Sequence, residues 1–140
     1  MSECTFCRII AGELPAEVVY EDETAIAFLD NAPLERGHTL VVPRRHARNL
    51  FDIDPRLAAQ VTQAVARIAQ PLVAATGANG LNVSQNNEPA AGQVVFHYHV
   101  HLIPRWDEPV YAARHRGRLS LSQEEMAFIG QAIRDQLYES

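Results

Sequence analysis

Three histidines alternate with apolar residues in the run Val-Phe-His-Tyr-His-Val-His-Leu-Ile-Pro, which spans residues 95–104. Alternation with a period of two is typical of a β-strand, because successive side chains of a strand point to opposite faces. On such a strand His97, His99 and His101 share one face. The other face carries Phe96, Tyr98, Val100 and Leu102. We therefore predict a strand that buries its apolar face and presents three imidazoles, side chains suited to chemistry near neutral pH, on the other.

Strand geometry limits what this row of imidazoles can do. Residues two apart on a strand are separated by roughly 6.6–6.8 Å at Cα, so His97 and His101 lie roughly 13 Å apart. Such a row cannot easily close around one zinc ion, which needs Zn–N distances of roughly 2.0–2.1 Å, although two neighbours can converge. The row therefore suggests divided roles: a metal ligand, a nucleophile and a group that binds an anion. The alternative is a polar sheet face that carries histidines without a function.

Composition favours a single globular domain without a broad nucleic-acid-binding surface. The chain has 140 residues, of which 47% are hydrophobic and 21% are charged, as in an ordinary globular domain. A net charge of −5 argues against nucleic acid as a partner, because such surfaces are strongly basic. No stretch reaches the roughly 18 apolar residues of a membrane helix, and the first residues do not resemble a secretory signal. We expect a cytoplasmic protein with no membrane partner.

The remaining hydrophobic pattern predicts an α+β domain. Short apolar runs bounded by turn residues predict strands at 18–20, 25–29, 38–42 and 81–85, besides the histidine strand. Apolar residues at helical spacing follow Asp54-Pro55, a capping residue and a proline at the first helical position, and stop near Gly77. Ser122 and Glu125 form a capping box for a C-terminal helix. We predict a five-stranded antiparallel sheet with one long helix and a C-terminal helix.

The only two cysteines, Cys4 and Cys7, form a C-x-x-C pair near the N-terminus. In a reducing compartment this spacing indicates a metal clip or a redox pair. Structural zinc takes four nitrogen or sulfur ligands, so two histidines would complete such a site. A thioredoxin-like redox centre is disfavoured because no βαβ pattern follows the cysteines. An incidental pair of thiols is the remaining alternative.

Three segments together resemble the histidine triad family of nucleotide-binding proteins. They are the cysteine pair, the strand from Gly37-His38 to His46, and the stretch from Asn86 to Arg105. The family signature is His-φ-His-φ-His-φ-φ, where φ is apolar, and residues 97–103 match it fully. The resemblance implies one domain over residues 1–140, with residues 106–140 as a C-terminal extension. It also implies a homodimer in which two sheets join about a two-fold axis.

The resemblance implies a role for each histidine. In zinc-binding members, the partners of Cys4 and Cys7 match His46 and His97, which gives a closed structural zinc site. The middle histidine of the triad, His99, matches the family's nucleophile, and we expect a carbonyl to hold its Nδ1–H and leave Nε2 free. The third, His101, matches a residue that contacts the phosphate. His38 matches a further member of the active-site cluster; alone it would read as a hydrogen-bonded core histidine.

The nucleotide-binding residues also follow from the resemblance. Asn86 and Gln93 match positions at the α-phosphate, and Gly92 permits a close approach of the backbone. Asp30 matches the acidic residue that binds the ribose hydroxyls, and its alternative is a turn aspartate. Val94 departs from the family, since many relatives have Ser or Thr there. The basic stretch 114–118 is either a flap over phosphates or solvated surface.

The sequence leaves several functions open. The resemblance implies hydrolysis of a purine nucleoside 5′-phosphate derivative at its α-phosphorus, through a nucleotidyl-histidine intermediate, of the nucleoside phosphoramidase type. A dinucleoside polyphosphate hydrolase is the alternative within the same chemistry. A non-catalytic nucleotide-binding adaptor and a metal-dependent hydrolase with His97 and His99 as ligands come from other classes. Four protein ligands on zinc disfavour the last, because no coordination position stays open.

Overall fold

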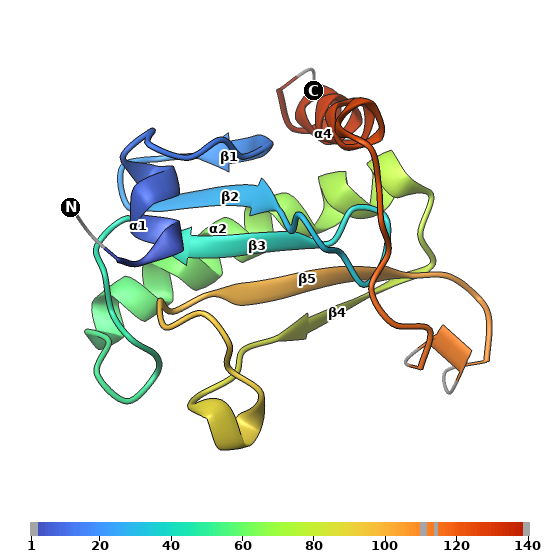
Figure 1. The fold of residues 1–140 in the computed structure, drawn as a ribbon. Helices are drawn as coiled ribbons and strands as arrows, with labels where there is room; N and C mark the ends of the chain where they lie inside the picture. Colours follow the sequence, from blue (N-terminus) through green and yellow to red (C-terminus); the bar gives the residue numbers. More distant parts are fainter. Residues whose placement is uncertain (1–2, 110–111, 114, 139–140) are drawn as a thin grey trace.

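A five-stranded antiparallel sheet forms the centre of the molecule, in the strand order β1-β2-β3-β5-β4. The computed structural model describes residues 3–109, 112–113 and 115–138. The strands are β1 (Val18–Glu21), β2 (Ala25–Leu29), β3 (Thr39–Pro43), β4 (Gly80–Ser84) and β5 (Val100–Arg105). The predicted fold class is confirmed, and Figure 1 shows the sheet with the long helix behind it.

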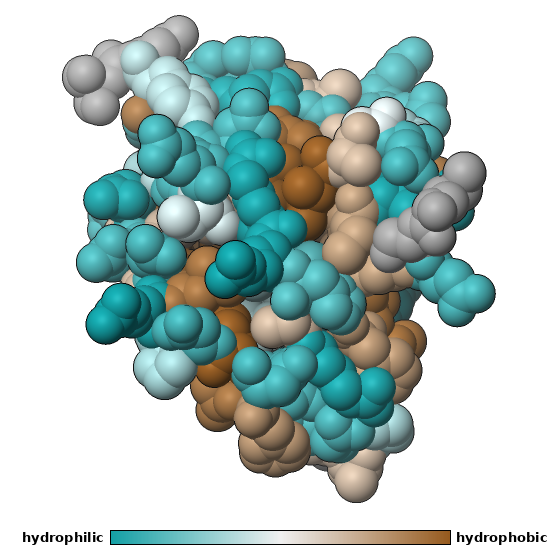
Figure 2. Space-filling model, turned by 90° about the vertical axis from the view of Figure 1, so that its left-hand side faces the viewer, coloured by the Kyte–Doolittle hydropathy of each residue, from teal (hydrophilic) through white to brown (hydrophobic). Residues whose placement is uncertain are grey.

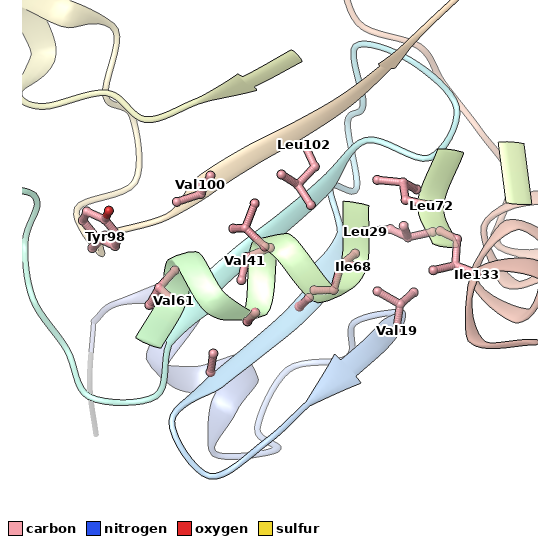
Figure 3. Close-up of a cluster of buried hydrophobic side chains, with 14 of the residues drawn as sticks. Val19, Leu29, Val41, Val61, Ile68, Leu72, Tyr98, Val100, Leu102 and Ile133 are labelled. Carbon is pink, nitrogen blue, oxygen red and sulfur yellow. The ribbon is translucent and has the colours of Figure 1, made fainter. Parts of the chain in front are cut away.

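The long helix α2 (Pro55–Thr76) covers one face of the sheet. It begins where the Asp54 carboxylate accepts the Arg56 N–H at 2.8 Å, and it ends at Gly77, whose φ is 68°. These are the start and stop signals that the sequence carries. Its buried face consists of Val61, Ala64, Val65, Ile68 and Leu72. These side chains meet the apolar residues of the inner strands in the main core (Figure 3).

The other face of the sheet carries a smaller cluster. Helix α1 (Thr5–Ile10) places Phe6 against Phe28, with ring centroids 5.3 Å apart. A short 3-10 helix, η1 (Pro89–Ala91), lies in the loop between β4 and β5. The side of the molecule that carries α1 has separate apolar patches between hydrophilic side chains (Figure 2).

The C-terminal helix α4 (Gln123–Tyr138) packs on α2 and β1. Its predicted capping box is present: the Ser122 N–H donates to Glu125 Oε1 at 3.1 Å, and the Glu125 N–H donates to Ser122 Oγ at 3.0 Å. The segment that leads into α4 passes the loop after β2, where the Leu119 N–H donates to the Pro33 carbonyl at 2.7 Å. Within the described residues, no helix combines the length and the apolar character that crossing a bilayer requires.

The histidine strand is shorter than predicted, because β5 begins only at Val100. Its pairing with β3 stops at Val41–Val100, near Pro43, which has no N–H to donate to a neighbouring strand. The Tyr98 N–H instead donates to the Ala47 carbonyl at 2.7 Å. His97 and His99 therefore precede the strand, and the expected straight row of three imidazoles does not form.

The alternation of inward and outward side chains still holds for most of this segment. Tyr98, Val100 and Leu102 belong to the main core, while His97 and His99 are buried on the opposite side. Phe96 departs from the prediction, because it is 37% exposed and lies under the Arg48 guanidinium, 4.3 Å from it.

Candidate functional site

Two cysteines and two histidines from distant parts of the chain form a tight cluster at the N-terminal end of α1. Cys4 Sγ lies 3.4 Å from His97 Nδ1, and Cys7 Sγ lies 3.4 Å from His46 Nδ1 and 3.5 Å from His97 Nδ1. The two Nδ1 atoms are 3.2 Å apart. The cysteines are thiols and not a disulfide. The structure thus brings together all four residues that the resemblance assigned to zinc.

The geometry of this cluster fits a tetrahedral zinc ion. Zn–S bonds of roughly 2.3 Å and Zn–N bonds of roughly 2.0–2.1 Å give tetrahedron edges of roughly 3.5 Å between sulfur and nitrogen, and roughly 3.3–3.4 Å between two nitrogens. His97 Nε2 lies 2.8 Å from the Pro43 carbonyl. Because a carbonyl only accepts, Nε2 carries the hydrogen, and the lone pair of Nδ1 points at the cysteines. A Cys₂His₂ set of this kind is closed and structural.

A second group of possible ligands, Asp30, His38 and His101, does not suit a metal ion. The Leu34 N–H donates to His38 Nδ1 at 3.0 Å, so the hydrogen of the neutral ring sits on Nε2. That Nε2 lies 3.0 Å from His101 Nδ1 and 3.8 Å from the Asp30 carboxylate. A nitrogen that carries a hydrogen offers no lone pair to a metal. The contacts form a hydrogen-bond chain instead.

These hydrogen bonds from Leu34 through His38 determine which nitrogen of His101 carries its hydrogen. Since His38 Nε2–H donates to His101 Nδ1, the His101 hydrogen sits on Nε2, where it can donate to a ligand. Burial lowers the pKa of both imidazoles to about 4. The Leu34 N–H thus orients His38, and His38 in turn leaves His101 as a neutral ring whose Nε2–H can donate.

His99 has the orientation that a nucleophile needs. Its Nδ1 lies 2.7 Å from the His97 carbonyl, so Nδ1–H donates there and Nε2 keeps a lone pair. The carbonyl partner expected from the sequence is present. Burial lowers the pKa of this imidazole. The ring is 7% exposed and packs edge-on against Phe6, with centroids 5.2 Å apart. No described residue hydrogen-bonds its Nε2.

A cavity of about 920 Å³ lies in front of His99 and His101. One part is apolar and is built by α1, β2, β3 and the start of α4; its apolar lining includes Phe6, Ile9, Phe28, Leu40, Leu121 and Met126. Polar lining comes from Ser84, Asn86 and Gly92, from the two histidines, and from Asp30 and Arg118. The cavity can therefore hold a ligand that has both an apolar and an anionic group.

The loop between β4 and β5 presents two of its three predicted residues to the cavity. Asn86 lines it, and the Asn86 amide has no partner among the described residues. Gly92 lines it as well, with a φ of 91°. Gln93 does not line it and is only 3% exposed. Its Oε1 accepts from the Glu88 N–H at 2.8 Å, and its Nε2 donates to the carbonyls of Arg48 and Val95. In this arrangement the Gln93 side chain contacts the protein and not the cavity, and its contact with phosphate stays a prediction.

Asp30 lines the cavity beside Arg118, whose Nη1 lies 3.3 Å from Asp30 Oδ2. The other carboxylate oxygen accepts the Ala32 N–H at 2.9 Å, which is the turn contact of the alternative interpretation. The basic stretch 114–118 is thus partly fixed: Arg116 pairs with Glu35 and Glu108, and Arg118 lies in the cavity wall. Residue 114, which also belongs to this stretch, lies outside the described residues.

Sequence reasoning missed most of the apolar wall and Ser84. Phe6 lies between the two cysteines and Ile9 follows them one helical turn later, while Phe28 lies two residues before Asp30. Both segments could have been assigned to the wall from their position beside the motifs. Ser84 pairs with His101 across β4 and β5, and only the strand register reveals this neighbour. Leu121 and Met126 come from a segment that carries no motif.

Comparison with known proteins places this arrangement in a family. The model of the HIT domain matches residues 11–108. The chain belongs to the HIT domain family. It is 48% identical to "Protein hit" of Bacillus subtilis over 103 residues, which cover 74% of this chain and 71% of the relative. It is 39% identical to "Adenylylsulfatase HINT3" of Arabidopsis thaliana over 127 residues, 90% of this chain and 64% of the relative.

A solved HIT structure bears on the metal cluster. The zinc-bound histidine triad family protein from Mycobacterium smegmatis superposes with a TM-score of 0.85 at 33% identity, over 98% of this chain and 94% of that one. Zinc in that HIT protein agrees with the fit of the four-residue cluster here. The α4 segment lies beyond the residues that the HIT model matches.

Proposed function

We propose that this HIT protein hydrolyses nucleoside 5′-phosphate derivatives at the α-phosphorus, with His99 as a covalent nucleophile. One observation carries the proposal: the His97 carbonyl holds His99 Nδ1–H at 2.7 Å, which leaves the Nε2 lone pair directed away from the backbone in a ring that lines the cavity. An uncharged imidazole is a suitable nucleophile for phosphorus, and it is also a good leaving group. Burial lowers the pKa of His99 from its ordinary value, which favours the neutral ring.

The reaction proceeds in two displacements. His99 Nε2 forms a bond to the α-phosphorus as the bond to the leaving group breaks, and the leaving group takes a proton from solvent. Water then forms a bond to phosphorus as the P–Nε2 bond breaks, and the proton of that water passes to solvent. The product is a nucleoside 5′-monophosphate. His101 Nε2–H and the Asn86 amide donate to the phosphate oxygens, where negative charge is concentrated.

The cavity supports a purine nucleotide as the substrate. The base fits the apolar part beside Phe6 and Phe28, and the ribose hydroxyls donate to the Asp30 carboxylate, which exchanges its contact with Arg118. The leaving group is an amine, as in a nucleoside phosphoramidase. An acidic leaving group is the second candidate, because the Arabidopsis relative is named an adenylylsulfatase. A dinucleoside polyphosphate belongs to the same acidic class.

Cys4, Cys7, His46 and His97 hold a structural zinc ion in this proposal. When bound, the ion joins α1 to the segment that carries His99. The reduced pair of cysteines fits a reducing compartment such as the cytoplasm. A homodimer and the absence of a nucleic-acid partner complete the proposal.

A side-by-side assay on adenosine 5′-phosphoramidate, adenylyl sulfate and a dinucleoside polyphosphate tests the function. We expect steady-state turnover of at least one substrate by the native protein and none by His99→Ala. A folded, nucleotide-binding protein that turns over none of the three would favour the adaptor instead.

A further inference from the structure

The loop that presents Asn86 and Gly92 to the cavity is joined to a second loop by a dense set of hydrogen bonds. The Arg48 guanidinium donates to both carboxylate oxygens of Glu88, from Nε and Nη2, at 2.8 Å each. The Asn49 amide donates to Glu88 Oε2 at 2.6 Å and to Gln93 Oε1 at 3.1 Å. We call Arg48, Asn49, Glu88 and Gln93 the clamp. It joins the segment that starts at the zinc ligand His46 to the loop 86–93.

The clamp holds the loop in an unusual conformation. Glu88 has a φ of 76°, and it is the only described residue other than glycine with a positive φ. Such a backbone is rare for L-residues and persists only where its surroundings determine it. Here the Glu88 N–H donates to Gln93 Oε1, while three donors of the clamp converge on the Glu88 side chain.

One half of the clamp is buried, while the Arg48 and Glu88 side chains are 47% and 38% exposed. Asn49 is 1% exposed and Gln93 is 3% exposed. None of the four clamp residues lines the cavity, although Asn86, Gly92 and Val94 do. A further hydrogen bond connects the same two loops, since the Leu50 N–H donates to Asn87 Oδ1 at 2.7 Å. The clamp residues thus lie outside the cavity lining, but they hold the loop at Glu88 and Gln93, within two residues of Asn86 and Gly92.

We propose that the clamp positions the loop 86–93, so that Glu88 and Gln93 act on phosphate binding and turnover through Asn86 and Gly92. This inference rests on the proposed function. A displacement of about 1 Å in a positioned donor can cost about 100-fold in rate, so hydrogen bonds that hold the loop with Asn86 in place are expected to matter for the reaction. Glu88 and Gln93 are positioning residues and not catalytic ones.

The donor and acceptor pattern identifies the informative substitutions. Glu88→Gln puts an NH₂ group where only donors converge, and Gln93→Glu turns the Nε2 donor into an oxygen that faces two carbonyls. Both changes keep the size of the side chain. Glu21→Gln is the matched control, because it removes a carboxylate that is paired with Arg44 at 3.4 Å and lies outside the cavity. Val61→Ala controls for lost stability, because Val61 is buried in α2.

The test uses the full zinc-loaded chain and three readouts: amide hydrogen exchange over residues 86–94, AMP binding, and kcat/KM. We expect Glu88→Gln to speed exchange in this loop and to lower kcat/KM by about 10- to 100-fold, whereas Glu21→Gln and Val61→Ala change neither. Zinc content stays at the native level. In an Asn86→Ala background, Glu88→Gln should cost far less than in the native protein, because the clamp acts through Asn86.

Three results would overturn the proposal. One is unchanged exchange over residues 86–94 in Glu88→Gln and Gln93→Glu. Another is faster exchange with native kcat/KM and AMP affinity, which would make the clamp purely structural. The last is full additivity of Glu88→Gln with Asn86→Ala. If the native protein turns over no substrate, the proposed function fails, while exchange and AMP binding still decide the role of the clamp.

Discussion

At the scale of single residues, backbone groups determine the chemistry of the histidines. The Pro43 carbonyl directs the Nδ1 lone pair of His97 to the cysteines, the His97 carbonyl directs Nε2 of His99 to the cavity, and the Leu34 N–H orients His38. The sequence motif shows where the histidines stand in the chain, but it does not indicate which backbone carbonyl lies beside each ring. Only the carbonyl partner of His99 could be expected in advance, from the resemblance to a known family.

His38 should make the stability of the protein depend on pH. Burial lowers its pKa to about 4, against the opposing charge of Asp30 and with the help of His101, Arg118 and Arg105. Between about pH 6.5 and pH 4, His38 is protonated in the unfolded chain but neutral in the folded protein. The contribution of His38 to the free energy of unfolding is therefore full above about pH 6.5 and falls toward pH 4. Between pH 7 and 5 we expect the native protein to lose about 1–2 kcal/mol more than His38→Asn in urea unfolding. Parallel losses would show that His38 titrates normally.

At the scale of elements, the sequence predicts helices better than the start of the histidine strand. Local signals fix α2 and α4, because Asp54, Gly77 and the Ser122–Glu125 box act within one turn. The start of β5 depends on Pro43 in a neighbouring strand, and the role of Gln93 depends on Asn49, 44 residues away. Partners that distant leave no periodicity in the sequence.

Gly37 has both a strained backbone and a crowded position, so Gly37→Ala should be costly. Its φ is 90°, and a Cβ would lie 2.7 Å from Thr76 Cγ2. We expect a loss of about 2–4 kcal/mol in the free energy of unfolding. Gly12→Ala is the control, because Gly12 has a φ of 79° with no atom near a Cβ, and about 1 kcal/mol should be lost there. Equal losses in urea titrations would remove the contact with Thr76 from the explanation.

Zinc should stabilise α1 without taking part in the reaction. Helix α1 has only 6 residues, too few to be stable alone, and two ligands flank its first turn. We expect Cys4→Ser to lower zinc content and to lower Tm by about 5–10 °C, as for a loss of about 2–3 kcal/mol. The folded fraction should keep its turnover number. Native Tm with no bound zinc would contradict a structural role.

At the scale of the whole molecule, the two edges of the sheet differ. Helix α4 packs on β1, while the outer side of β4 has no strand neighbour among the described residues and exposes 53% of Val83. An open edge strand invites pairing with another chain. We therefore propose that two copies of the protein join through β4. We also propose that residues 1–140 form one domain, with 106–140 as its C-terminal extension.

Val83→Asp should then separate the two copies. A carboxylate on each β4 would place like charges together at the two-fold axis, whereas the folded single chain keeps this exposed position in water. We expect sedimentation at micromolar concentration to give a dimer for the native protein and a monomer with native far-UV circular dichroism for the variant. A native monomer would refute the joined sheets.

The covalent role of His99 is the central claim, and trapping the intermediate tests it most directly. The native protein is mixed briefly with adenosine 5′-phosphoramidate, quenched without acid and digested, and its peptides are weighed by mass spectrometry. We expect one adenylyl group on the peptide that contains His99, with fragmentation placing it on that ring, and no adduct in His99→Ala. Turnover at the native rate by His99→Ala, or an adduct on His101 instead, would contradict the mechanism.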